Sequence, residues 1–146
     1  GAFGPQMHPG KRRAGRVVVM MKVNLRDMSH TEFMERLTDR TVILIPLGSL
    51  EVQGPHAPMG DYALAERLAE LSAEKGQGLC APVLPFGHAD FFRGFAGGIQ
   101  LRARTLAMVL EDVLTGFMDH GLDRLLVFNG HTTNLPIIDQ VTRKLR

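Results

Sequence analysis

The stretch TVILIPLG, residues 41–48, is apolar and rich in β-branched side chains, and apolar residues do not alternate with polar ones. This pattern is typical of a strand that is buried on both faces of a parallel sheet. The segment GSLEVQGPHAPMGDY, residues 48–62, then places carboxylates, an imidazole, glycines and prolines directly after the strand. Because charged groups are costly to bury, this loop is a candidate functional segment.

Outward from this strand, helical and strand patterns alternate along the chain. Ser29 and Glu32 have the spacing of a capping box, which predicts a short helix ahead of the strand. Strands that alternate with helices imply right-handed crossovers and a parallel sheet. We therefore predict an α/β protein, with three α/β/α layers around a mainly parallel sheet. The expected helices are 28–40, 61–78, 104–121 and 134–146, and the expected strands are 41–48, 79–87 and 123–130.

Two of these helices have readable apolar faces. In the helix expected at 61–78, Asp61 is predicted as the N-cap and three leucines at helical spacing are predicted to face the core. These are Leu64, Leu68 and Leu71. The helix expected at 104–121 carries one apolar stripe, formed by Leu106, Val109, Leu110, Val113, Leu114 and Phe117.

Composition restricts the class of protein. With 146 residues, 45% of them apolar, the chain is long enough for one domain with its own core. The formal net charge is +2, and the basic cluster KRRAGR at 11–16 supplies much of that excess. A near-neutral body with one tyrosine and no tryptophan argues against nucleic-acid binding. We expect residues 1–20 to be a flexible basic leader and residues 21–146 to be the domain.

Cysteine content and hydropathy bear on the compartment. No apolar run approaches the roughly 18 residues of a membrane span, so we expect no membrane association. The single cysteine, Cys80, excludes a disulfide within the chain and fits a reducing cytoplasm. Cys80 lies in an apolar strand, which is typical of a core residue rather than a nucleophile.

The loops after the strands contain the polar residues that could form a site. In an open α/β sheet, the loops at the carboxyl ends of the strands lie together and carry the site. Two carboxylates and an imidazole can bind a divalent metal, which activates water and polarises a carbonyl, so this pattern favours hydrolysis. Simpler roles are also open, with Asp61 as an N-cap, Glu51 as a solvated carboxylate and His131 as a turn residue. The residues in these loops are Glu51, Asp61, His88, Asp90, Asn129 and His131.

Three motifs in order resemble the creatininase family of metal-dependent amidohydrolases: IPLGSLEVQGPHAPMGD, LPFGHADFFRGFAGGIQL and DHGLDRLLVFNGHTTN. The resemblance covers residues 41 to about 140. It implies that Glu51, Asp61 and His131 hold the first metal of the family. The positions of the second-metal ligands are Gln53 and Thr133, which are poor ligands for a transition metal. We therefore expect one divalent metal per chain, Zn, Mn or Fe.

The resemblance also implies a reaction. Creatininase and the related formamidopyrimidine deformylases hydrolyse C–N bonds, so a small cyclic amide or a formamide is the expected substrate. Glu51 and His131 are then catalytic through the metal, and His88 is the candidate for proton transfer. Asp90 and Asn129 are the candidates that orient substrate. The segment 86–98, which holds His88 and Asp90, is either a lid over substrate or an irregular connection packed on the sheet.

A different class of function stays open at this point. The chain could be a non-catalytic creatininase-like subunit that binds a metal or ligand, or that assembles with a partner. The loss of the second-metal ligands at positions 53 and 133, where Gln53 and Thr133 stand, favours this alternative. The resemblance implies that family members continue beyond the helix that ends here at Arg146. We therefore expect a chain truncated at its C-terminus, either a fragment of a longer enzyme or a natural short form. A truncated sheet exposes a strand edge, and we therefore expect a homo-oligomer rather than a stable monomer.

Overall fold

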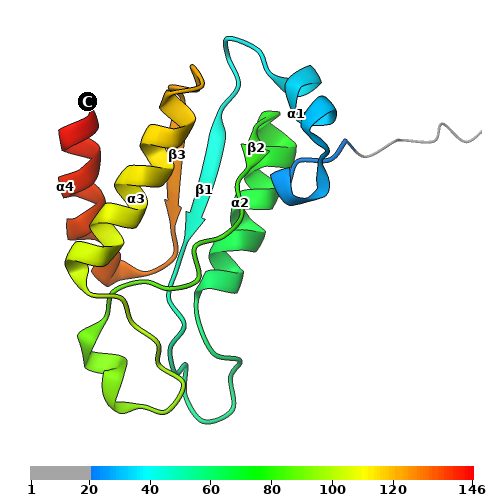
Figure 1. The fold of residues 1–146 in the computed structure, drawn as a ribbon. Helices are drawn as coiled ribbons and strands as arrows, with labels where there is room; N and C mark the ends of the chain where they lie inside the picture. Colours follow the sequence, from blue (N-terminus) through cyan, green and yellow to red (C-terminus); the bar gives the residue numbers. More distant parts are fainter. Residues whose placement is uncertain (1–20) are drawn as a thin grey trace, which may run out of the picture.

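A parallel three-stranded sheet forms the centre of the protein. The computed structural model describes residues 21–146, and the leader predicted at 1–20 lies outside the described residues. Strand β1 (Ile43–Leu47) is central, with β2 (Leu79–Cys80) and β3 (Leu125–Asn129) on either side of it (Figure 1). Both neighbours run parallel to β1, as the alternating sequence pattern predicts.

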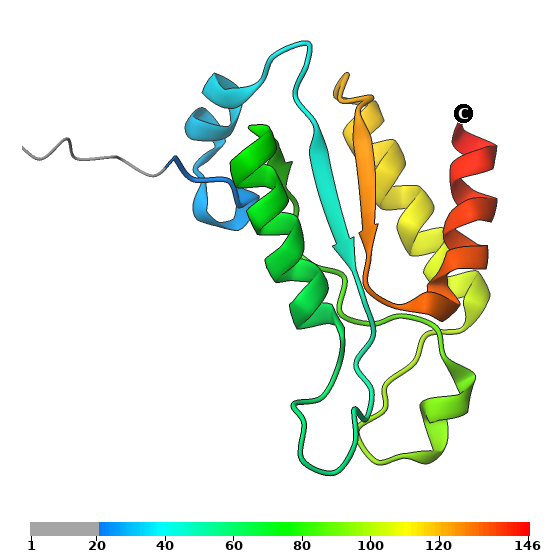
Figure 2. The ribbon, with the colours of Figure 1, turned by 180° about the vertical axis from the view of Figure 1, so that it is seen from behind.

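Helices cover both faces of this sheet. Helix α2 (Tyr62–Gly76) lies on one face, and α3 (Ala103–Met118) and α4 (Leu135–Leu145) lie on the other (Figure 2). The predicted three-layer α/β/α fold is therefore confirmed. Helix α1 (His30–Arg36) lies at the amino end of β1, and its predicted capping box is present. Short 3-10 turns occur at Leu25–Asp27 (η1), Asp90–Gly94 (η2) and Thr132–Asn134 (η3).

The core is divided by the faces of β1. Ile43 and Ile45 pack with Leu110 and Leu114 of α3, whereas Leu44 on the opposite face packs against the alanines of α2. Every residue of β1 is buried, as the uninterrupted apolar run predicts. Full burial of such a side chain contributes roughly 1.5–3 kcal/mol, so β1 anchors both layers.

The predicted apolar face of α2 is wrong. Leu64 and Leu68 are 62% and 43% exposed, and the buried face of the helix consists of the small residues Ala65, Ala69 and Ala73. The physical reason is the close approach of the helix to the chain after β3. A Cβ on Gly130 would lie 2.8 Å from the Cβ of Ala65, so a larger side chain does not fit at Ala65. Ala69 and Ala73 are buried against Leu44.

Two strands also differ from the sequence prediction. The strand predicted at 79–87 is regular only at Leu79–Cys80, because the prolines that follow cannot donate to a ladder. An isolated bridge between Leu47 and Leu84 continues the pairing. Strand β3 is only partly buried, with Leu126 49% exposed, because it pairs on one side only within the described sheet. Among residues 21–146, no helix is both long and apolar enough to cross a membrane.

Candidate metal centre

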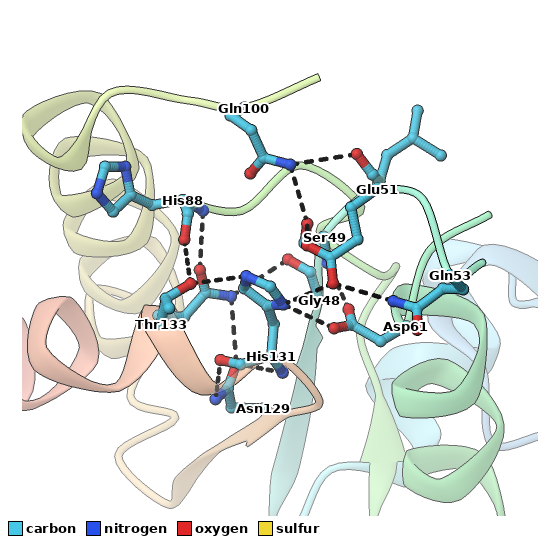
Figure 3. A network of polar contacts seen from close by, with 12 residues as sticks. Gly48, Ser49, Glu51, Gln53, Asp61, His88, Gln100, Asn129, His131 and Thr133 are labelled. Carbon is cyan, nitrogen blue, oxygen red and sulfur yellow. Dashed lines mark hydrogen bonds and ion pairs between the residues drawn. The ribbon is translucent and has the colours of Figure 1, made fainter. Parts of the chain in front are cut away.

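The carboxyl edge of the sheet brings together Glu51, Asp61 and His131 (Figure 3). Glu51 lies in the loop after β1, Asp61 directly precedes α2, and His131 follows β3. One ligand atom from each residue lies within 4.8 Å of the other two. The side chains of Glu51 and His131 are 5% and 6% exposed, and that of Asp61 is 18% exposed.

The imidazole of His131 faces both carboxylates through one nitrogen. Its Nδ1 lies 2.7 Å from Asp61 Oδ2 and 3.4 Å from Glu51 Oε1. Two carboxylates buried beside a single imidazole concentrate acceptor oxygens, and a bound cation would balance their negative charge. Carboxylate oxygen and imidazole nitrogen are also the donors that Zn, Mn and Fe accept, so the residues present fit a divalent metal.

The position of Asp61 is fixed by the chain around it. Asp61 occupies the predicted N-cap position of α2, but its side chain makes no capping bond, so capping does not explain this carboxylate. Its Oδ1 instead accepts a hydrogen bond of 2.7 Å from the backbone N–H of Ser49. Gly48 makes this approach possible, because a Cβ there would overlap the backbone of Tyr62 and lie 2.8 Å from Asp61 Oδ1.

Glu51 is held on both oxygens. Oε2 accepts a hydrogen bond of 2.8 Å from Ser49 Oγ, and Oε1 accepts one of 2.9 Å from Gln53 Nε2. The interpretation of Glu51 as a solvated loop carboxylate is therefore wrong. These two donors orient the carboxylate so that Oε1 points toward His131, which is the arrangement that a shared cation requires.

The loop after β3 is held by its own side chains. Asn129 Nδ2 donates to the carbonyl of His131 at 2.7 Å, and Asn129 Oδ1 accepts from the His131 N–H at 3.2 Å. The second ring nitrogen of His131, Nε2, lies 2.7 Å from Thr133 Oγ1. The Thr133 hydroxyl in turn donates to the carbonyl of His88. A partner on the outer nitrogen orients the ring and leaves Nδ1 for a ligand role.

His88, Asp90 and Asn129 are the three predicted site residues outside this candidate ligand group. The half-buried ring of His88 points away from His131 (Figure 3), and its Nδ1 lies 2.9 Å from the carbonyl oxygen of Leu101. Asp90 is exposed on η2 and forms an ion pair of 2.6 Å with Arg93. The hydrogen bond from Arg93 lowers the pKa of Asp90 below its ordinary value.

A fully buried asparagine, Asn134, connects the loops and was not singled out by the sequence analysis. Its Nδ2 donates to the carbonyl of Gly48 and to Asn129 Oδ1, each at 3.2 Å, and its Oδ1 accepts from the His88 N–H at 2.9 Å. Ser49 and Gln100, also buried at the site, were missed as well. For Asn134 a signal existed, because it closes the quoted motif NGHTTN at the start of the last helix.

The fold and this site define a class of α/β protein with a candidate metal centre at the carboxyl edge of a parallel sheet. The profile of the creatininase family, described as creatinine amidohydrolase, matches residues 26–146. The chain belongs to the creatininase family.

The chain matches several curated relatives, and each match covers only part of the relative's length. The chain is 32% identical over 111 residues to the 3-dehydro-scyllo-inosose hydrolase of Thermotoga maritima, covering 75% of this chain and 36% of that protein. It is 32% identical to the mycofactocin precursor peptide peptidase of Mycobacterium ulcerans, covering 71% and 45%. It is 30% identical to the creatinine amidohydrolase of Pseudomonas putida, covering 72% and 44%. The chain thus spans less than half the length of these relatives.

Solved structures of creatininase agree with the fold. A crystal structure of creatinine amidohydrolase is 28% identical and has a TM-score of 0.76, covering 86% of this chain and 52% of that one. A manganese form of creatininase is also 28% identical, with a TM-score of 0.77 and coverage of 86% and 53%. A mutant creatininase of the Zn–Zn type has the same TM-score, identity and coverage.

Proposed function

We propose that this chain is a metal-dependent amidohydrolase that hydrolyses the C–N bond of a small cyclic amide or a formamide. The observation that carries the proposal is the buried group of Glu51, Asp61 and His131, whose ligand atoms lie within 4.8 Å of one another. The relatives support the reaction class, because the names of all three describe hydrolases or peptidases. A small-molecule substrate is supported by creatinine amidohydrolase among them.

The metal supplies the reactive chemistry in this proposal. A divalent ion bound by three protein ligands provides a water of lowered pKa and polarises a substrate carbonyl. Glu51 and Asp61 together balance the charge of one such ion, so the site can accept a neutral amide. The proposal includes one Zn, Mn or Fe ion per chain. Gln53 and Thr133 support this number, because both are weak ligands that already bond to Glu51 and His131.

Hydrolysis of an amide also needs a proton for the leaving nitrogen. His88 is the proposed donor, and Asp90 and Asn129 are proposed to orient the substrate. Proton transfer by His88 requires its ring to turn away from the carbonyl of Leu101, where Nδ1 now lies at 2.9 Å. Thr133 connects the two parts of the site, because its hydroxyl contacts both the His131 ring and the His88 carbonyl.

Turnover of small cyclic amides and formamides by the Zn²⁺- or Mn²⁺-loaded chain tests this function. We expect Glu51→Gln to remove turnover, whereas the matched variant Glu35→Gln, on the exposed side of α1, keeps it. We expect His88→Ala to reduce the rate by about 10²–10⁴-fold, the usual contribution of a positioned acid or base. Turnover that is unchanged in Glu51→Gln contradicts the proposal. Metal binding without turnover of any amide favours a non-catalytic subunit.

Self-association and location complete the proposal. A homo-oligomer is supported by β3, which pairs on one side only within the described sheet and exposes Leu126. Sedimentation that shows a folded monomer at micromolar concentration would contradict it. A cytoplasmic location is supported by Cys80, a free thiol.

A further inference from the structure

A buried hydrogen-bond chain reaches Glu51 from the side opposite His131. Gln100 Nε2 lies 3.2 Å from Ser49 Oγ, and Ser49 Oγ lies 2.8 Å from Glu51 Oε2 (Figure 3). Ser49 is fully buried, and Gln100 is 9% exposed. Neither residue belongs to the metal-ligand group formed by Glu51, Asp61 and His131.

A backbone carbonyl determines which atoms donate along these hydrogen bonds. Gln100 Nε2 also lies 3.3 Å from the carbonyl oxygen of Leu50, and a carbonyl can only accept. The atom at this position must therefore be the amide nitrogen rather than the amide oxygen. Since the amide donates to Ser49 Oγ as well, the single hydroxyl proton of Ser49 is directed to Glu51 Oε2. The hydrogen bonds therefore run from Gln100 through Ser49 to the Glu51 carboxylate.

One polar atom of Gln100, the amide oxygen Oε1, is buried and has no hydrogen-bond partner among the described residues. An unpaired buried acceptor costs free energy, and an apolar side chain of similar size, such as methionine, would avoid this cost. Compared with methionine, glutamine adds at this position the two hydrogen bonds that its amide nitrogen donates.

We propose that Gln100 is a positioning residue of the metal centre, which acts through Ser49 to hold the Glu51 carboxylate in the orientation that a metal needs. The inference rests on the proposed function, because it needs a metal bound to Glu51. Partners of metal ligands orient those ligands, and their removal typically weakens metal affinity by about 10–100-fold. Gln100 touches neither the metal nor the substrate in this role.

The experiment is a double-mutant cycle on Zn²⁺ affinity, measured by competition with a chromophoric chelator. We expect Ser49→Ala and Gln100→Met each to weaken Zn²⁺ binding by about 10–100-fold. The double variant should bind within about threefold of Ser49→Ala, because coupled residues are not additive. The matched variant Gln140→Met, exposed on α4, should bind like the wild type. Circular dichroism in chelator establishes that each variant is folded, and Gln100→Asn replaces Gln100→Met if the latter does not fold.

A spectroscopic readout separates positioning from general destabilisation. The visible absorption of the Co²⁺-loaded chain reports ligand geometry, and we expect its band positions to change in Gln100→Met but not in Gln140→Met. A Gln100 variant with wild-type Zn²⁺ affinity and an unchanged Co²⁺ spectrum overturns the inference alone. Effects of Ser49→Ala and Gln100→Met that multiply in the double variant also overturn it. A wild-type chain that binds neither ion overturns the proposed metal centre, and this inference with it.

Discussion

Asn134 offers the sharpest test of how the site is held together, because one side chain joins three loops. Its amide makes hydrogen bonds to the Gly48 carbonyl, to Asn129 Oδ1 and from the His88 N–H, at 3.2, 3.2 and 2.9 Å. Each such bond contributes roughly 0.5–1.5 kcal/mol, and an orphaned buried group adds to the loss. We expect Asn134→Ala to lower the free energy of unfolding by about 3 kcal/mol.

Urea unfolding followed by far-UV circular dichroism, in the presence of chelator, measures this loss without a contribution from metal binding. Thr132→Ala removes an exposed side chain from the same turn, and we expect it to change the free energy of unfolding by less than about 0.5 kcal/mol. A loss below about 1 kcal/mol for Asn134→Ala would refute the reasoning, because three buried hydrogen bonds cannot then contribute to stability as described.

Three further results are expected. Elemental analysis of the purified wild-type chain should find about one equivalent of Zn, Mn or Fe. His131→Ala should remove this metal, whereas the control His120→Ala, at an exposed position, should retain it. Burial raises the pKa of the Cys80 thiol to about 11, so iodoacetamide at pH 8 should modify Cys80 only after denaturant is added. Ala69→Leu should lower the free energy of unfolding, measured in urea, by roughly 1–3 kcal/mol, whereas Leu64→Ala should have little effect. A larger loss for Leu64→Ala than for Ala69→Leu would contradict the observed buried face of α2.

The elements of the fold that could be predicted from the sequence have local signals. The uninterrupted apolar run of β1 indicates a strand buried on both faces, and the Ser29–Glu32 capping box marks the start of α1. The buried face of α2 was predicted incorrectly, because helical spacing reports which residues share a face but not how closely that face approaches the sheet. Where the approach is close, as at Gly130, alanine fits and leucine does not.

The grouping of Glu51, Asp61 and His131 was predictable because parallel topology brings the strand ends together, whatever their separation in sequence. The residues that form hydrogen bonds around this group follow no such rule. Gln100 and Ser49 are 51 positions apart, and Asn134 and Gly48 are 86 apart. Neither pair has a spacing that indicates contact, since each contact depends on the path of a loop. The direction of a side chain also depends on the path of its loop. The ring of His88, which was predicted beside the proposed metal, points away from His131 (Figure 3).

The polar residues beside the ligands bear on how many metals the site holds. Gln53 donates to Glu51 Oε1 at 2.9 Å, and Thr133 lies 2.7 Å from His131 Nε2, so both side chains already bond to the proposed metal ligands. Both are neutral, and the two carboxylates balance only a single divalent charge. A second ion needs new donors, and we expect the double variant Gln53→His/Thr133→Glu to raise the metal content from about one to about two equivalents. The isosteric Thr133→Val variant should stay at one or fewer. Two equivalents in the wild-type chain would contradict the reasoning, because Gln53 and Thr133 would then be sufficient ligands.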